Sequence, residues 1–147
     1  MWSWTGCLCL CGIWGASAPY LLNKAMKKTK GQLEAEISEA VIKFEKEYMG
    51  RGPLETKTYF TDDMVLVRLK GVLTKAERQL ATPGEIDKGR ELIKKVRIAL
   101  LEKGRPLLEA VVESIVGQKV ISLHTDISTV TGERIILFTL AAPVDYE

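Results

Sequence analysis

The residues of this chain that could do chemistry are few. The single histidine, His124, stands two positions before Asp126. Alternate residues of a strand lie on one face, so these two side chains could form a His/Asp couple that acts as a general base. A lone histidine on a strand is more often structural or exposed, and the pattern therefore assigns no catalytic residue.

Nucleophiles and metal ligands are also scarce. The three cysteines, Cys7, Cys9 and Cys11, form a C-x-C-x-C run near the start of the chain. A structural zinc site needs about four ligands, and the chain has no further cysteine. No serine has a nucleophile-elbow context. The sequence therefore predicts no catalytic residue, no metal and no cofactor. It leaves enzyme activity an open question, with a non-enzyme favoured.

The stretch Gly50-Arg51-Gly52-Pro53 raises the question of anion binding. It follows a predicted helix, where the dipole has the wrong sign for an anion, and it lacks the lysine and hydroxyl residue of a phosphate loop. The glycines and the proline fit a helix stop and a strand entry. Arg51 is not needed for a turn. It binds either a carboxylate or phosphate ligand or, as the favoured interpretation, a carboxylate of its own fold.

Further charged candidates lie on a predicted long helix. Arg90 and Arg97 are seven residues apart and so lie roughly on one face, and Glu113 falls beside the apolar stripe of the same helix. With Arg51 and Asp126 they form the candidate ligand-binding set. A buried or groove-lining set of arginine and glutamate is one interpretation, and a solvated helix flank is the favoured one.

The elements that position these side chains can be read from periodicity. Apolar residues recur at helical spacing from Leu33 to Tyr48, and Gly50 stands where a left-handed C-cap is expected. Two strand-like runs, Thr56–Phe60 and Met64–Lys70, are separated by turn residues and predict a β-hairpin.

Two helices and two strands are predicted in the second half. Thr74 and Glu77 form a capping box that begins a short helix. A long helix from about Ile86 to Val116 is interrupted by Pro106, which predicts a kink or a break, and Gly117 caps its end. Its predicted inner face consists of apolar residues: Leu92, Ile93, Val96, Leu100, Leu107, Leu108, Val111, Val112 and Ile115. Strands Lys119–Ile127 and Glu133–Leu140 follow.

This order of elements predicts an α+β fold of two layers, α-β-β-α-α-β-β. Helices that flank hairpins favour a mostly antiparallel four-stranded sheet with helices covering one face. The edges of such a sheet remain open for pairing, which favours a homodimer. Residues 26–147 are interpreted as one domain.

The first 25 residues differ from the rest. Met1 to Asn23 carries no charge, and four lysines follow by residue 30. Four interpretations stay open: a secretory signal, a membrane anchor, a thiol metal site, and a segment outside the domain, which is either an upstream extension or the result of a misassigned start. The segment outside the domain is favoured, with the anchor second.

Composition narrows the class of protein. Charged residues make up 27% and hydrophobic residues 46% of the chain, and the formal net charge is only +2. That balance is normal for a soluble domain and gives no argument for nucleic-acid binding. Beyond residue 25 no cysteine is left that would need an oxidising compartment. The sequence therefore predicts a cytoplasmic protein, with a position at the inner face of the membrane as a further interpretation.

Several motifs occur together in one order. They are Gly50–Pro53, Gly71–Glu77, Gly89–Leu92 leading to Arg97, Val112–Val120, and Asp126 before Phe138–Leu140. In this combination the chain resembles the bacterial MpsC family over about residues 30 to 141.

The resemblance implies an accessory role beside companion membrane proteins of a sodium-translocating, membrane-potential-generating system, linked to sodium or inorganic-carbon transport. It supplies no catalytic residue. The first function hypothesis is therefore a regulatory or accessory domain that docks on a protein partner, such as a membrane transporter complex. The alternative is a small-anion or nucleotide sensor, or an enzyme, with an arginine-lined pocket.

Overall fold

The computed structural model describes residues 27–82 and 88–147. The predictions for residues 1–25, and the predicted helix start at Ile86, lie outside these ranges. The elements in chain order are α1 (Lys30–Met49), β1 (Glu55–Thr61), β2 (Met64–Lys70), α2 (Lys75–Ala81), α3 (Lys88–Val116), β3 (Val120–Ser128) and β4 (Glu133–Leu140). The predicted fold class, order of elements and two-layer arrangement are confirmed.

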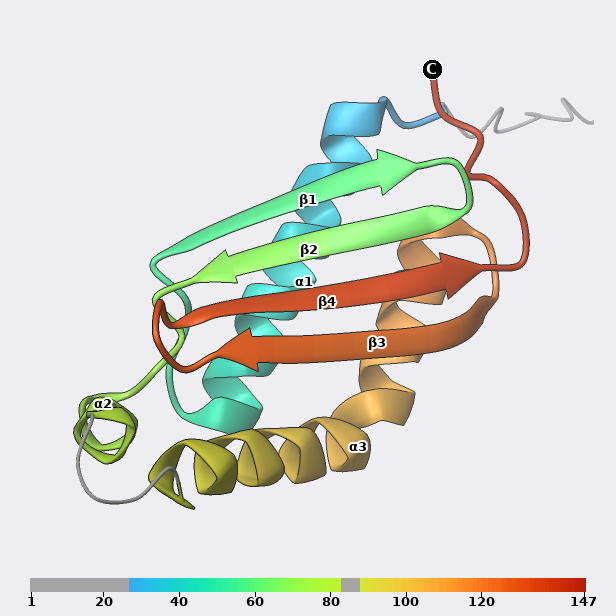
Figure 1. Cartoon of the computed structure of the whole chain (residues 1–147). Coiled ribbons are helices and arrows are strands. Elements are labelled where there is room, and N and C mark those ends of the chain that lie inside the picture. Colours follow the sequence, from blue (N-terminus) through green and yellow to red (C-terminus); the bar gives the residue numbers. More distant parts are fainter. Residues whose placement is uncertain (1–26, 83–87) are drawn as a thin grey trace, which may run out of the picture.

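The sheet has the strand order β1-β2-β4-β3, and all its neighbouring strands are antiparallel. The two hairpins meet where β2 pairs with β4, for example Val67 with Ile136. Both α1 and the C-terminal part of α3 lie behind the sheet, and the described residues leave its front face uncovered (Figure 1).

The first helix begins and ends at specific caps. Thr29 accepts a hydrogen bond from the Gln32 amide, and the Gln32 side chain accepts one from the Thr29 amide. Gly50 ends the helix in the left-handed region at φ 73°, where a side chain would be strained. The stretch Gly50–Pro53 is therefore a helix stop that leads into β1.

The core forms between the helices and the inner face of the sheet. In α1, Leu33, Ile37 and Val41 are buried at intervals of four residues. Val65 and Phe138 from the sheet meet the helices and are also fully buried. These alternating and helical periods are the sequence patterns that predict each element.

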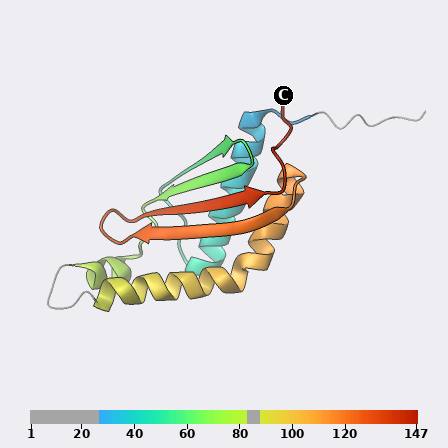
Figure 2. The same ribbon diagram turned by 45° about the vertical axis from the view of Figure 1, so that its right-hand side comes forward.

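The long helix α3 continues through Pro106 instead of breaking there. Its axis bends where the colour passes from yellow to orange (Figures 1 and 2), which agrees with the kink that proline predicts. Gly104 beside the bend is buried, and a Cβ added there would lie 2.4 Å from Cε2 of Phe44. The bend therefore brings α3 against α1 at a point where no side chain fits.

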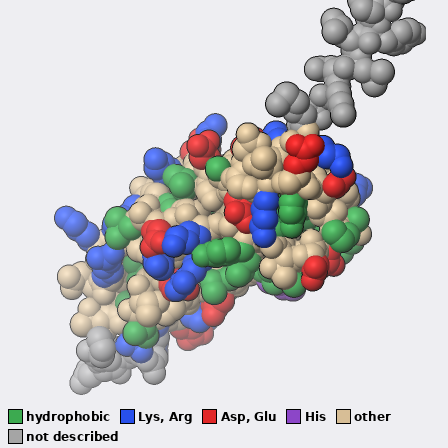
Figure 3. All heavy atoms as spheres, turned by 90° about the horizontal axis from the view of Figure 1, so that it is seen from above, with side chains coloured by type: hydrophobic (Ala, Val, Ile, Leu, Met, Phe, Trp, Pro, Cys, Tyr) green, Lys and Arg blue, Asp and Glu red, His purple; other side chains and the backbone are tan. Residues whose placement is uncertain are grey.

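Charges of both signs are mixed on the face of the molecule that is seen from above (Figure 3). From above, acidic and basic side chains alternate with hydrophobic ones, with no large field of one sign (Figure 3). Within the described residues, no helix is both long enough and apolar enough to cross a membrane.

Candidate functional site

Four charged residues meet in and beside the core. Glu45 comes from α1, Glu77 from α2, Arg97 from α3 and Arg134 from β4. Glu45, Arg97 and Arg134 expose no more than 2% of their surface. Charged residues are rarely buried this completely unless they are paired, so their contacts decide what the cluster does.

The contacts form a chain of ion pairs. Arg134 Nη1 donates to Glu45 Oε1 at 2.7 Å. Arg97 donates from Nε and Nη2 to the two carboxylate oxygens of Glu77, each at 2.8 Å, and Nη2 also donates to the Val72 carbonyl at 2.8 Å. Arg97 Nη1 and Glu45 Oε2 lie 3.5 Å apart and close the chain as an ion pair without a hydrogen bond.

The pKa values of the two acids shift in opposite directions. Burial raises the pKa of Glu45, against the attraction of Arg134 and Arg97. Burial alone would also raise the pKa of Glu77, but hydrogen bonds from Arg97 and from the Thr74 backbone outweigh it and lower the pKa to about 2. Burial lowers the pKa of Arg134. Glu77 is thus the ionised anchor of the cluster, with its side chain 20% exposed, and Glu45 and Arg134 are its fully desolvated part.

This cluster belongs to the scaffold and is not a ligand site. A cavity that it lines measures about 10 Å³, with Arg97, Thr125 and Arg134 among its walls. That volume is at the lower limit for a single water molecule. The cluster ties both helices of the helix layer and α2 to β4.

The structure brings the three predicted arginines to one segment. Arg51 Nη1 donates to the Leu73 carbonyl at 3.1 Å, and Arg90 Nε donates to the Ala81 carbonyl at 3.2 Å. With the bond from Arg97 to Val72, all three fasten the connection from β2 to the end of α2. Arg51 therefore binds its own fold, through a carbonyl and not through the carboxylate that the sequence favoured.

The remaining predicted residues lie elsewhere. Glu113 Oε1 accepts the Val120 amide at 2.9 Å and so joins the end of α3 to the start of β3, close to the positive-φ Gly117. Asp126 is exposed and pairs with Lys94 at 3.1 Å. His124 is exposed on the same strand face as Asp126. Of these residues, Asp126 borders the cavity of about 10 Å³ together with Arg97, and that cavity is too small for a ligand.

The structural motifs have identifiable tasks. Thr74 and Glu77 form the predicted capping box at the start of α2. The amide of Gly117 donates to the Glu113 carbonyl at 2.9 Å. A Cβ added to Gly52 would meet only the flexible Lys46 side chain at 2.9 Å, so the backbone does not require glycine there.

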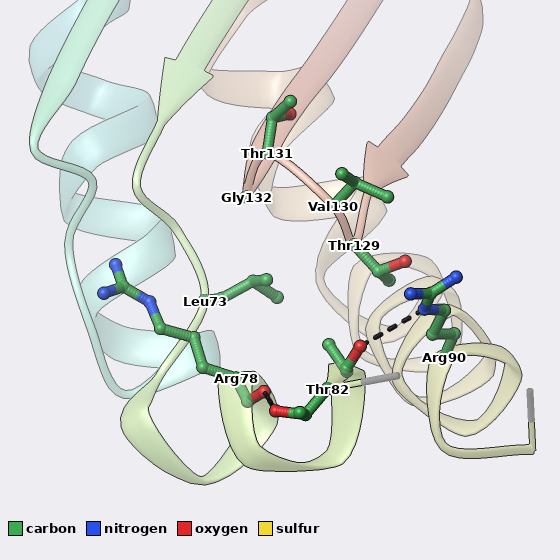
Figure 4. Close-up of a pocket in the computed structure, with 9 residues that line it drawn as sticks. Leu73, Arg78, Thr82, Arg90, Thr129, Val130, Thr131 and Gly132 are labelled. Atoms are coloured by element: carbon green, nitrogen blue, oxygen red, sulfur yellow. Dashed lines mark hydrogen bonds between the residues drawn. The ribbon is translucent and has the colours of Figure 1, made fainter. Parts of the chain in front are cut away.

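One surface pocket contains an arginine of the predicted set. It has a volume of about 510 Å³ and lies between α2, the start of α3 and the turn before β4. Arg90 points toward Thr129, whereas the guanidinium of Arg78 points away from it (Figure 4). The pocket therefore has one arginine aimed at it, beside the hydroxyls of Thr82 and Thr131.

The α3 helix is more apolar than its packing requires. Its buried residues are Ile93, Arg97, Leu101, Gly104, Leu108, Val112 and Val116. Leu92, Val96 and Leu107, predicted on the inner face, are instead exposed by 52%, 46% and 49%. That prediction is wrong because two adjacent apolar stripes share the helix, and only one of them meets the core.

Leu107, the last of these exposed residues, lines a groove between the helices. Leu107 and Val111 of α3 and Ala40 and Phe44 of α1 line this groove, whose volume is about 190 Å³. Lys43 and Glu47 stand at its border and lie 4.0 Å from each other. We call Leu92, Val96, Leu107 and this groove the α3 apolar surface. It is the candidate functional site.

Sequence reasoning missed two members of the buried cluster, although both have a signal. Glu45 continues the four-residue series of Ile37 and Val41 in α1. Arg134 alternates with the buried Ile136 and Phe138 in β4. A charge at an inward position of each element indicates a buried pair of opposite sign.

The described residues contain no group of three or more histidine, cysteine, aspartate or glutamate side chains placed to hold a metal ion.

Comparisons with known proteins agree with the extent of this fold. Residues 29–142 match the family described as "Na+-translocating membrane potential-generating system (MpsC)". The uncharacterized protein YbcI of Bacillus subtilis (strain 168) is 44% identical over 115 residues, which cover 78% of this chain and 90% of that protein. The uncharacterized protein YrhF of the same organism is 27% identical over 112 residues, covering 75% and 88%. No solved structure matches.

Proposed function

Since this chain belongs to the MpsC family, we propose that it is a non-catalytic accessory domain that binds a protein component of a sodium-translocating, membrane-potential-generating system. The α3 apolar surface carries the proposal. The domain acts at the inner face of the membrane, where it holds or regulates its partner.

The chemistry of the surface defines the partner. Leu92 and Val96 are one helical turn apart and about half exposed, so they stand as neighbouring knobs on α3. Burying a leucine or valine side chain contributes about 1.5–3 kcal/mol. An apolar helix of the partner fits such a stripe and the groove beside it, because helical knobs at intervals of three and four residues fill grooves of this kind.

The state of the charged residues supports binding over catalysis. Arg51 and Arg97 donate to main-chain carbonyls of their own fold, and Arg97 is also paired with Glu77. Glu113 accepts a main-chain amide. These residues hold the scaffold that presents α3, and their charges are directed into the chain.

Binding can be tested by co-purification from cells that carry the membrane proteins of such a system. We expect the full chain to co-purify with one of these membrane proteins and Val96→Glu to reduce its recovery at least about tenfold, because a carboxylate would be desolvated at the interface. Val130→Glu is the matched control, since Val130 is 79% exposed in the turn before β4.

Two results would count against the proposal. One is the absence of every one of these membrane proteins from the purified wild-type sample. The other is equal recovery with the wild type, Val96→Glu and Leu92→Glu. Circular dichroism of the purified variants separates lost binding from lost folding.

The pocket at Arg90 supports a second candidate function, the binding of a small anion or nucleotide. Its volume of about 510 Å³ lies within the range of small-ligand pockets. Thr129 lies nearest to Arg90, and Thr131 lines the pocket farther from it (Figure 4).

A thermal-shift series with phosphate, nucleotides and bicarbonate tests this candidate. Specific binding raises the melting temperature of the wild type progressively with the logarithm of ligand concentration, and Thr131→Val removes that rise while the fold remains. Arg51→Ala serves as a comparison, because Arg51 does not line this pocket. Equal melting temperatures with and without every ligand would exclude the candidate.

A further inference from the structure

The uncovered face of the sheet carries a row of side chains that is apolar on β1, β2 and β4 and ends at His124 on β3. Tyr59 pairs with Leu66, Leu66 with Leu137, and Leu137 with His124. Ile135 lies two residues from Leu137 on the same face and is 41% exposed, and Tyr59 is 43% exposed. The described residues place no helix over this row (Figure 1).

The charges beside the row balance within the face. The basic side chains are Lys57, Arg68 and Lys70, and the acidic ones are Glu55, Asp126 and Glu133. Arg68 forms a bidentate salt bridge with Glu133, in which Nε and Nη2 each donate to a carboxylate oxygen at 2.9 Å. Glu55 pairs with Lys70 at 2.8 Å and with Lys57 at 3.2 Å. The face therefore has no net charge and offers no unpaired charge to a charged partner.

We propose that this face binds the same face of a second copy of the chain. A two-fold contact brings identical surfaces together, so a face with a net charge would repel itself. Here three acids balance three bases, and all six lie on one side of the apolar row, with Thr61, Met64 and Thr139 on its other side. This surface is separate from the α3 apolar surface, because α3 lies behind the sheet or below it (Figure 2).

The size of the face sets the strength of the contact. Four strands spaced by about 4.8 Å, each with about seven residues of 3.4 Å, give a footprint of roughly 450 Å² per copy. Two copies bury about 900 Å², which is less than a stable specific interface buries and falls in the range of weak, transient contacts. The dimer is therefore reversible and depends on protein concentration.

The sheet edges fit this role less well than the face. On the β1 edge, Lys30 Nζ donates to the Phe60 carbonyl at 3.3 Å and occupies a group that a new strand would need. On the β3 edge, the register shifts between Val120 and Ser122, which interrupts regular pairing. We therefore expect a second copy to pack on the face of the sheet and not to pair with an edge strand.

Sedimentation equilibrium of the full chain between about 10 and 500 µM tests the proposal. We expect the mean mass to rise from one chain toward two, and Leu66→Glu to weaken this association at least about tenfold, since the carboxylate enters the interface twice. Tyr59→Lys is the second variant, chosen because its exposed position leaves folding intact. Val130→Glu and Val96→Glu are controls that keep the wild-type association.

The opposite results are equally clear. The mass of a single chain at every concentration overturns the proposal, and so does an association that survives both Leu66→Glu and Tyr59→Lys. Loss of association in Val96→Glu alone would assign it to the α3 apolar surface instead. Failure of the dimer leaves partner recovery in the co-purification experiment unchanged, so the two proposals fail separately.

Discussion

Arg97 and Glu77 form a bidentate salt bridge, in which Nε and Nη2 of Arg97 each lie 2.8 Å from a carboxylate oxygen of Glu77. The same carboxylate accepts the Thr74 amide at 2.7 Å and completes the cap of α2. The Glu77 side chain thus caps the N-terminus of the short helix α2 and also pairs with the buried charge of Arg97. The position of α2 depends on this double use of Glu77.

Replacing Glu77 should therefore lower the stability of the fold by more than the loss of a helix cap does. Glu77→Gln retains an acceptor for the Thr74 amide but removes the negative charge beside Arg97, which stays buried. We expect the free energy of unfolding to fall by about 2–3 kcal/mol, because breaking a largely buried pair leaves a charge uncompensated. Urea unfolding measures the change. Glu91→Gln is the control, since Glu91 and Lys95 form an exposed pair, and no measurable change is expected. Equal effects of the two substitutions would contradict the pairing.

The ionisation of the Glu77 carboxylate should also make the stability of the fold depend on pH. The pKa of Glu77 is lowered to about 2 from its usual 4.5, so the unfolded chain takes up the proton first on acidification. The contribution of Glu77 is fully present above about pH 4.5 and is lost as the pH falls toward 2. The pKa of Glu45 is raised by burial, so its contribution has the opposite sign and is lost as the pH rises.

Unfolding free energies at several pH values between about 7 and 3 separate the two acids. We expect the difference between the wild type and Glu77→Gln to shrink as the pH falls. A difference that stays constant would mean that the charge of Glu77 contributes nothing beyond the cap.

Arg134 and Glu45 should behave as a coupled pair. Arg134→Met leaves Glu45 buried with only Arg97 nearby, at 3.5 Å, and should destabilise the fold by about 3–5 kcal/mol. The double variant Glu45→Met/Arg134→Met removes one charge of each sign and retains the pair of Arg97 with Glu77. It should lose clearly less stability than the sum of the single variants. Additive losses in a double-mutant cycle would show that the two side chains are independent.

Gly104 should not tolerate even one added methyl group. Gly104→Ala improves intrinsic helix propensity by about 1 kcal/mol, but its Cβ would lie 2.4 Å from Cε2 and 2.6 Å from Cζ of the buried Phe44. We expect a net destabilisation of about 1–3 kcal/mol, measured as a lower midpoint of thermal unfolding. Gly31→Ala in α1 is the control, because nothing lies within 4 Å of its Cβ position. A more stable Gly104→Ala variant would indicate that Phe44 moves aside freely.

The elements of this fold follow from local periodicity, which explains their accurate prediction. The strand Met64–Lys70 has the bounds that alternation predicts, and α1 ends at the glycine that its pattern requires. Arg97 was identified as a candidate, but the sequence could not distinguish a solvated flank from a buried pair. That distinction depends on Glu45 and Glu77, which other helices bring to it.

The strand order and the uncovered apolar stripe depend on distant contacts. Nothing local in Leu92 or Val96 separates them from Ile93, because all three fit one broad apolar arc of α3. The packing of α1, α2 and β3 against α3 decides which part of that arc is buried. The antiparallel pairing of β2 with β4 likewise joins residues about 70 positions apart along the chain, beyond the reach of turn chemistry.

The two ends of the described chain meet. The Lys27 ammonium pairs with the Asp145 carboxylate, and the Glu147 amide donates to the Lys28 carbonyl at 3.4 Å (Figure 1). A short linker from residue 147 to residue 27 would therefore close the backbone into a ring. The ring could be reopened at the exposed turn around Asp62, between β1 and β2, without removing a strand pair. A circular permutant of this kind would move both ends of the chain to the hairpin turn and keep the helix layer continuous.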